Sequence, residues 1–153
     1  MALPVSLDSV AEELNALMDE TTAFIKRTTG EIASVSADDA ALVEDEAEEN
    51  DLPKWQKEAL PKLREILLGN DWVRLPSKVD IHEWKIMRKF ADSVQNEPLR
   101  DRLGRALGGK GAFRMFRATV DDAGLLDAWY LFRHAQLREI AKEALDSLGI
   151  PYS

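Results

Sequence analysis

Apolar residues recur at spacings of three and four along much of the chain, the pattern that is typical of amphipathic helices. The first such stretch covers residues 7–18, and either Asp8 or Ser9 is its expected N-cap. Its apolar face consists of Leu7, Val10, Leu14 and Leu17. The same pattern predicts further helices over residues 53–68, 80–94, 98–107, the segment directly after Gly111, and 125–148. Asp38 and Asp39 can start a short helix over residues 40–47.

Two details refine these predicted helices. Pro61 lies inside the 53–68 stretch and cannot donate a backbone hydrogen bond, so we expect either two short helices or a kink there. Asp80 is the expected N-cap of the next helix, with Glu83 as its capping-box partner. The apolar face of that helix consists of Trp84, Met87, Phe90, Ala91 and Val94.

Strand-forming residues gather in the first half of the chain. Residues 21–36 carry β-branched residues on both sides of Gly30, which favours a β-hairpin. Residues 72–75 are short, β-prone and followed by Pro76, so they can add a third strand. The predicted fold is therefore α+β, with five or six helices and a small two- or three-stranded antiparallel sheet near the N-terminus.

Length and composition limit the possibilities further. The 153 residues fit a single domain with a real core. The chain has no cysteine, which excludes disulfides, thiolate metal sites and thiol catalysis. We see no secretory signal and no apolar run of the roughly 20 residues that a membrane-spanning helix needs. We therefore expect a cytoplasmic protein with no membrane association.

The net charge of −8 is distributed unevenly. Residues 1–52 hold 14 of the 28 acidic residues but only two bases, which gives −12. Residues 53–153 hold the other 14 acids and 18 bases, which gives +4. An acidic connector around residues 38–52 contributes much of the negative charge, and a solvated acidic surface is the simplest interpretation.

Three of the eight glycines gather between residues 108 and 111. With Gly104 and Lys110 they approach the spacing of a phosphate-binding P-loop. However, Gly111 replaces the Ser or Thr that would bind magnesium, and the preceding residues predict a helix where a P-loop needs a strand. Nucleotide hydrolysis is therefore rejected. Two alternatives remain: the glycines separate two helices, or they expose backbone N–H groups to an anion.

Basic residues cluster around these glycines. Residues 100–117 contain six bases and one acid. Lys110, Arg114 and Arg117 would share one helical face if the helix included Lys110. Such a face could bind an acidic protein, a phosphorylated ligand or a nucleic acid. The interleaved Phe113 and Phe116 follow a spacing that favours the core over base stacking.

Arg133 lies near the middle of the apolar arc of the last predicted helix. A buried guanidinium needs a carboxylate or an anionic ligand, because leaving it unpaired is costly. Glu83 is the preferred partner, and Asp122 and Asp127 are alternatives. The pair would either fix how two helices pack or place Arg133 at the floor of an anion site.

The sequence contains no recognisable catalytic or metal-binding pattern. His82 and His134 are the only histidines, and neither belongs to a metal-ligand spacing. No serine lies in the sequence context of a nucleophile elbow. We therefore assign no catalytic residue, no metal and no cofactor.

Several blocks of residues resemble a known family. They are Thr29-Gly30-Glu31, Leu75-Pro76-Ser77 with Glu83 and Ile86-Met87, Gly109-Lys110-Gly111-Ala112-Phe113-Arg114 with Phe116, Trp129-Tyr130 with Phe132-Arg133, and Gly149-Ile150-Pro151-Tyr152. Across most of its length the chain thus resembles the bacterial uncharacterised protein family numbered zero-one-five-eight. The resemblance implies a small cytosolic bacterial protein with helices and a few strands. It implies no activity and no catalytic residues.

The residues together favour a non-enzymatic binding or regulatory module. Its predicted binding residues for an anion or partner are Lys110, Gly111, Arg114, Arg117 and Arg133. The expected partner is an acidic protein or a phosphorylated ligand. One alternative is nucleic-acid binding, and the other is an enzyme that holds an anionic substrate with Arg133 and uses Glu83 as general base.

Overall fold

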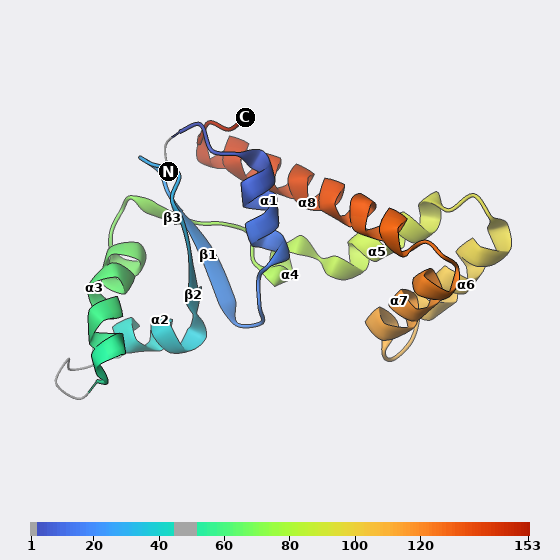
Figure 1. Cartoon of the computed structure of the whole chain (residues 1–153), viewed down its shortest axis with the longest axis horizontal. Helices are drawn as coiled ribbons and strands as arrows, with labels where there is room; N and C mark the ends of the chain where they lie inside the picture. The colour runs from blue at the N-terminus through green and yellow to red at the C-terminus, as the bar shows by residue number, and fades with distance from the viewer. Residues whose placement is uncertain (1–2, 45–51) are drawn as a thin grey trace.

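The fold is α+β and predominantly helical, as the sequence predicts. We describe residues 3–44 and 52–153 of a computed structural model (Figure 1). In chain order the elements are α1 (Leu7–Asn15), β1 (Thr21–Lys26), β2 (Ile32–Ser36), α2 (Ala37–Glu44), α3 (Lys54–Leu68), β3 (Trp72–Arg74), α4 (Lys78–Ile81), α5 (Glu83–Ser93), α6 (Glu97–Leu107), α7 (Ala112–Asp122) and α8 (Leu126–Leu148). The helices outnumber the five or six expected, partly because one predicted helix is divided into α4 and α5.

The sheet is antiparallel, with strand order β2-β1-β3. Gly30, in the β1–β2 turn, adopts a φ of 79°, which glycine tolerates better than other residues. A Cβ atom at Gly30 would also lie 2.3 Å from Cγ1 of Val5. The turn of the hairpin therefore packs directly against the N-terminal segment, and both predicted strand regions are confirmed.

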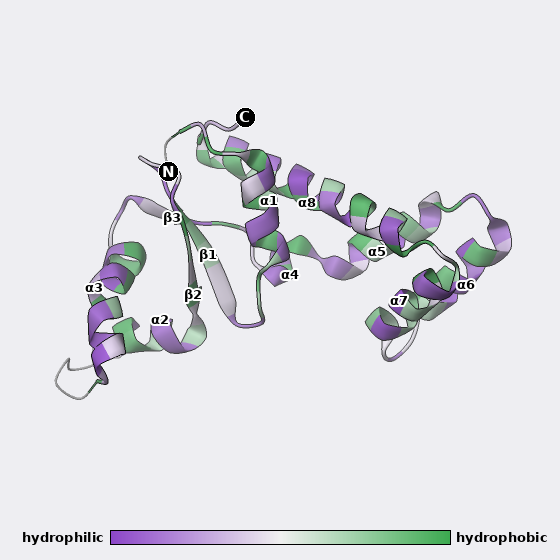
Figure 2. Cartoon of the chain, in the orientation of Figure 1, coloured by the Kyte–Doolittle hydropathy of each residue, from purple (hydrophilic) through white to green (hydrophobic). Residues whose placement is uncertain are grey.

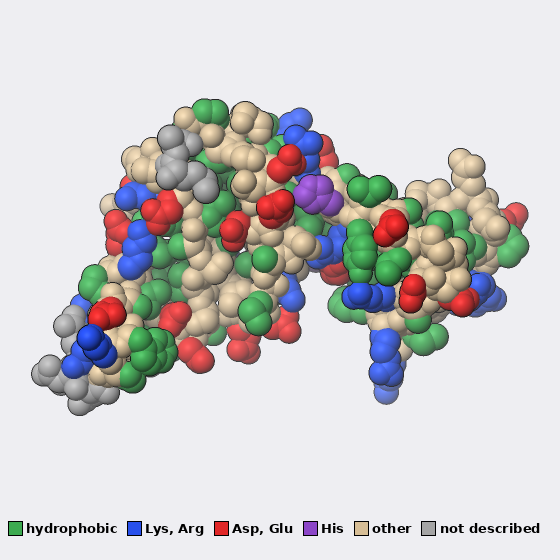
Figure 3. Space-filling view, viewed as in Figure 1, with side chains coloured by type: hydrophobic (Ala, Val, Ile, Leu, Met, Phe, Trp, Pro, Cys, Tyr) green, Lys and Arg blue, Asp and Glu red, His purple; other side chains and the backbone are tan. Residues whose placement is uncertain are grey.

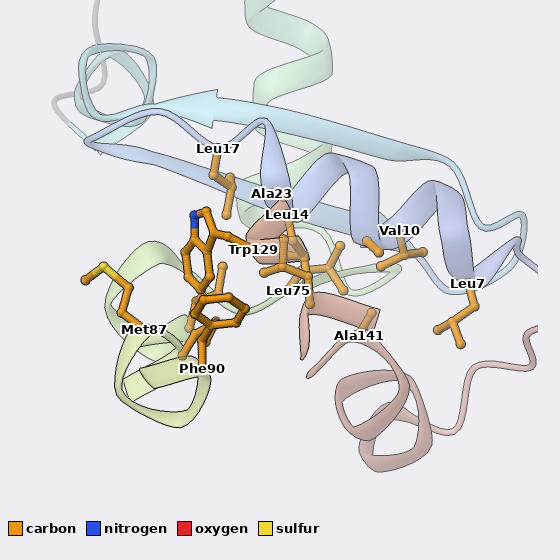
Figure 4. Packing of buried hydrophobic residues seen from close by; sticks show 14 of the residues in the cluster. Leu7, Val10, Leu14, Leu17, Ala23, Leu75, Met87, Phe90, Trp129 and Ala141 are labelled. Atoms are coloured by element: carbon orange, nitrogen blue, oxygen red, sulfur yellow. The ribbon is translucent and has the colours of Figure 1, made fainter. Parts of the chain in front are cut away.

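The main core lies where α1, α5 and α8 converge beside the sheet (Figures 1 and 4). Phe116 and Trp129 are buried in it, and their ring centroids lie 5.0 Å apart in an edge-to-face arrangement. The ring of Phe90 contacts both of them edge-on. These aromatic contacts join α5, α7 and α8 into one packed unit.

A second and smaller core lies between α2, α3 and the sheet. It contains Leu60, Leu63 and Ile66 from α3, together with Trp72 of β3. The acidic stretch predicted as a connector begins within α2, whose first turn is capped when Ser36 Oγ accepts from the backbone N–H of Asp39. Residues 45–51, where the rest of that acidic stretch falls, lie outside the described residues.

The terminal segments are held together at one end of the molecule (Figure 1). Val5 and Tyr152 form an isolated parallel bridge, and the backbone N–H of Val5 donates to the carbonyl of Pro151 at 3.0 Å. Burial raises the pKa of the Tyr152 hydroxyl. These contacts fix where α1 enters and where α8 ends.

Three local predictions need correction. Ser6, not Asp8 or Ser9, caps α1. Helix α3 runs unbroken through Pro61, so two separate helices are wrong there. Ser77 and Asp80 form a capping box that starts α4, and the predicted box of Asp80 with Glu83 is absent.

The remaining helices follow their apolar patterns, and Figure 2 shows polar and apolar positions alternating around them. Asn96 caps α6, and Pro98 lies in its first turn, where a missing N–H costs little. Among the described residues, no helix combines the length and apolar character needed to cross a bilayer.

Candidate functional site

A groove runs along the molecule between the sheet end and the α6–α7 hairpin. It consists of three pockets that share lining residues. The first and second pockets share Asp19, Lys78 and Val79, and the second and third share Asn15, Glu83, Phe113 and Arg133. In Figure 3 the molecular outline is indented between the part of the molecule that contains the sheet and the part that contains the α6–α7 hairpin. We call the three pockets together the groove.

The middle pocket has a volume of about 570 Å³. Its walls come from the end of α1, from α4, from the start of α5, from the first turn of α7 and from α8. Apolar atoms predominate in its lining, and Leu14, Leu17 and Ile81 contribute to its base. A pocket of this size and character is suited to an apolar ligand or side chain.

The Glu83–Arg133 ion pair predicted from the sequence forms the floor of the groove. Arg133 Nε donates to Glu83 Oε1 at 2.6 Å, and Nη2 donates to Oε2 at 3.2 Å. A third hydrogen bond runs from Nη1 to Oδ1 of Asn15. The two charged side chains are 21% and 30% exposed, so the pair is partly buried rather than deep in the core. The guanidinium thus joins α1, α5 and α8.

The position of Glu83 follows from a local break in the chain. His82 adopts a left-handed conformation with φ of 54°, which ends α4 and starts α5. Glu83 therefore occupies the first turn of α5, where the positive end of the helix dipole favours a carboxylate. The predicted continuous helix over residues 80–94 is wrong at this point. The residues around His82 in the sequence carry no turn signal that would predict this break.

The same break places two apolar side chains on the groove walls. Val79 of α4 is 78% exposed and Trp84 of α5 is 44% exposed. Trp84 Nε1 donates to the backbone carbonyl of Leu107 at 3.0 Å, which fixes the indole against the end of α6. Trp84 was predicted as part of a buried stripe, and this half-exposed wall position corrects that assignment.

Phe113 forms the opposite wall. It lies in the first turn of α7, is 58% exposed and lines two of the three pockets. Its predicted place in the core is wrong, whereas Phe116, one helical turn later, is buried as expected. Helical periodicity correctly places Phe113 and Phe116 on one face of α7. That face points into the groove at Phe113 and into the core at Phe116.

Gly111 directs α7 toward the groove. It adopts φ of 70° as the N-cap of α7, and no side-chain hydrogen bond caps this helix. Lys110 therefore lies in the turn before α7 and does not share a helical face with Arg114 and Arg117 as the spacing suggested. Gly104 lies within α6, so the P-loop-like residues do not form a phosphate loop.

The six bases of residues 100–117 fall into two groups. Three make contacts within the protein. Arg100 donates to the Val94 carbonyl, Arg102 pairs with Asp122, and Arg117 donates to the hydroxyl of Tyr130 at 2.7 Å and lies against its ring. Lys110, Arg105 and Arg114 are exposed, with no ion pair among the described residues. We call Lys110, Arg114 and Arg117 the basic rim of the groove. Phe113, which lies between Lys110 and Arg114 in the sequence, lines the third pocket, as does Arg117.

The other candidate groups lie apart from the groove or are already paired. Lys78 pairs with Asp19 at 3.2 Å between the first and second pockets. Hydrogen bonds from the backbone N–H and the side chain of Ser77 lower the pKa of Asp80. His134 is exposed and lies near Asp8. Within residues 3–44 and 52–153, no three His, Asp or Glu side chains gather as metal ligands.

Sequence reasoning missed several groove residues. Asn15 and Val79 lie on elements that are distant in sequence from Phe113, and neither belonged to a recognised motif. The only signals in the sequence were that Asn15 is a polar residue at the end of the first helix and that Val79 is an apolar residue in a polar segment. Comparisons with known protein families, curated proteins and solved structures found no match. The resemblance to the family numbered zero-one-five-eight therefore stays a prediction.

Proposed function

We propose that this protein is a non-enzymatic cytoplasmic binding module that holds an acidic partner protein against the groove and the basic rim. The observation that carries the proposal is the juxtaposition of exposed Phe113 with the unpaired cations Lys110 and Arg114. Apolar side chains that remain in contact with water, beside cations without internal partners, are typical of a surface that another protein covers. The cations would steer an acidic partner, and the apolar walls would supply binding free energy.

The geometry gives less support to catalysis. Both oxygens of Glu83 accept hydrogen bonds from Arg133, so the carboxylate is engaged by its partner and is not directed at a bound substrate. The charge of Arg133 is likewise compensated within the protein. An anion would have to displace Glu83 to gain the full interaction with the guanidinium. Arg133 therefore acts mainly as part of the groove floor, and its paired guanidinium is poorly suited to capturing a free anion.

Nucleic-acid binding remains the second candidate, because exposed aromatic rings lie beside cations. Phe113 and Tyr130 both line the third pocket, and Arg117 lies against the Tyr130 ring. Such rings can stack on bases in single-stranded nucleic acids. The net charge of −8 opposes this function, because the acidic N-terminal third would repel a phosphate backbone.

A charge-reversal capture experiment tests the proposal. The double variant Lys110→Glu/Arg114→Glu is compared with Lys54→Glu/Lys57→Glu, which changes the charge equally on α3, away from the groove. Tagged proteins capture partners from nuclease-treated lysate at two salt concentrations. We expect wild type and the α3 variant to retain the same acidic proteins, and the rim variant to lose them. Equal capture by both variants would overturn the proposal. Capture by the wild type from untreated lysate but not from nuclease-treated lysate would favour nucleic acid.

A further inference from the structure

We infer that the groove accepts an amphipathic α-helix of the partner, with its apolar ridge between the apolar walls of the groove and its acidic C-terminal end at the basic rim. The inference rests on the proposed function and specifies the occupant of the same surface. Exposed apolar side chains are its first support. Nine large hydrophobic side chains are exposed in the described residues, and five of them line the groove: Met18, Val79, Trp84, Phe113 and Tyr130. Concentration of such residues in one concave region indicates a surface that is covered in use.

The form of the groove favours a helix over a compact ligand. Its three pockets have volumes of about 510, 570 and 400 Å³ and follow one another through shared lining residues. A row of pockets matches the ridge of side chains that a helix presents at positions i, i+4 and i+7. A small metabolite would fill one pocket and leave the apolar walls of the others in water.

The charges along the groove define the direction of the helix. Its middle is compensated internally, because Arg133 pairs with Glu83 and Lys78 pairs with Asp19. The basic rim makes the α7 end positive, whereas at the opposite end the charge of Glu20 is balanced by that of Arg74. A helix carries partial negative charge at its C-terminus and partial positive charge at its N-terminus. The C-terminus therefore belongs at the rim, where acidic side chains would also gain most.

Arg133 can contribute to the same complex without losing Glu83. A guanidinium has five N–H donors. Three of them are used by Glu83 and Asn15 within the described structure. The remaining donors can bond to an acceptor on a partner helix that lies across the middle pocket, such as a Ser, Asn or Glu side chain. The pair then orients the partner as a fixed polar contact between the apolar walls of the groove.

Titration with synthetic peptides tests this inference. Three peptides of equal length, about 18 residues and so roughly 27 Å as helices, are added to the isotope-labelled full-length protein. The first has leucines at i, i+4, i+7 and i+11 and glutamates near its C-terminus. The second replaces the glutamates by lysines, and the third has the composition of the first with its leucines spread around the helix. We expect the first to bind at least about tenfold more tightly than the others and to shift the NMR signals of Val79, Trp84 and Phe113.

Surface variants supply the matched control. Val79→Asp and Phe113→Ser change exposed groove residues, so the fold should be retained, whereas Leu131→Asp changes a side chain that is 74% exposed on α8 and lines none of the three pockets. We expect each groove variant to weaken binding of the first peptide about tenfold and Leu131→Asp to leave it unchanged. Equal binding of the first and third peptides overturns the inference. The inference is also overturned if no peptide is preferred and the protein instead forms a dimer that Val79→Asp abolishes.

The two proposals fail separately. If partner capture depends on Lys110 and Arg114 but the three peptides bind alike, the acidic-partner function stands and the helical occupant is wrong. If the first peptide binds in the groove but charge reversal of Lys110 and Arg114 leaves both capture and peptide affinity unchanged, the role of the basic rim is wrong. Both results can be read from the same purified variants.

Discussion

The α3 and α7 regions carry similar numbers of cations but use them differently. On α3, Lys62 pairs with Glu31 at 2.9 Å and with Glu65 at 3.5 Å, and its ammonium lies over the ring of Trp72. On and before α7, Lys110 and Arg114 have no ion-pair partner among the described residues. Lys62 is therefore part of the packing between α3 and the sheet, whereas Lys110 and Arg114 are available to a partner.

The apolar residues of the two regions differ in the same way. The core under α3 is closed, with Leu60 and Ile66 buried, although Trp55 and Leu68 remain exposed on the outside of the helix without lining the groove. At α7, the apolar face continues from buried Phe116 to exposed Phe113, which lines the groove. Charge count and hydrophobic content alone do not distinguish a structural surface from a binding surface. The two kinds of surface are distinguished by whether the cations have ion-pair partners and by whether the exposed aromatic rings line a groove.

The largest expected effect comes from opening the main core. Phe116→Ala removes a ring that contacts Phe90 and Trp129, and we expect it to lower the free energy of unfolding by about 4 kcal/mol. Leu60→Ala in the smaller core should cost about 3 kcal/mol. Urea denaturation of both variants measures these changes.

Hydrogen exchange then sharpens the comparison. We expect Leu60→Ala to increase exchange in α2 and α3 and to leave α8 protected, because the two clusters share no buried residue. Phe116→Ala should increase exchange throughout α5, α7 and α8. If Leu60→Ala exposes α8 equally, the two cores unfold as one unit and the α3 region has no independent stability.

Breaking the floor of the groove should have a smaller effect. Arg133→Met leaves Glu83 partly buried without its partner, and we expect a loss of about 2 kcal/mol in unfolding free energy. A double-mutant cycle with Glu83→Gln isolates the interaction between the two side chains. The same cycle on the exposed α3 pair, with Lys62→Met and Glu31→Gln, should give a coupling below about 1 kcal/mol. Equal coupling in both cycles would contradict the distinction between floor and surface.

Much of the fold could be predicted because local rules act independently of tertiary context. Apolar periodicity identified α6 and α8 closely, and Gly30 between β-branched residues marked the hairpin. The turn at His82 could not be predicted, since a left-handed histidine is held by its surroundings and not by its own preference. Ser77 with Asp80 did carry a capping signal, but the competing pair Asp80 and Glu83 had the same spacing.

The candidate site was predictable only in part. The partner of Arg133 followed from physical need, because a charge within an apolar arc requires compensation, and Glu83 lay at the edge of another such arc. The groove itself is built by α1, α4, α5, α7 and α8, and no local pattern reports how such elements converge. Phe113 and Trp84 were assigned to the core because periodicity reports the direction of a side chain and not what covers it.

Gly109 and Gly111, in the turn before α7, offer a more local test of the α7 region. Gly111 has φ of 70°, and neither it nor Gly109 has an atom within 4 Å of an added Cβ. Gly111→Ala should therefore cost about 1 kcal/mol of stability through backbone strain alone, and Gly109→Ala should cost nothing measurable. Thermal or urea denaturation compares them. Equal stabilities would mean that Gly111 does not need the left-handed conformation to start α7 and position Phe113.

The smallest expected effect is the pH response of the α3 ion pairs. The hydrogen bond from Lys62 lowers the pKa of Glu31 below its usual value of 4.5, and Glu31 correspondingly raises the pKa of Lys62. Because the pKa of Glu31 is lower in the folded state, its contribution to stability is complete above the unfolded pKa and is lost as the pH falls through the folded pKa. Lys62→Met should raise the pKa of Glu31 and reduce this acid-side loss, as an NMR titration between about pH 2 and 6 would measure.

The rim supplies the control for this titration. Arg114→Met removes the same charge where no carboxylate is paired among the described residues, so we expect no change in the pKa of Glu31 or in the acid-side stability. Both members of the Glu31–Lys62 pair are nearly half exposed, and solvent therefore screens most of the interaction. If Arg114→Met shifts Glu31 as much as Lys62→Met does, the shift comes from the net charge of the protein. Lys62 would then not be distinguished by its partners, and its contrast with the unpaired Lys110 and Arg114 would lose its physical basis.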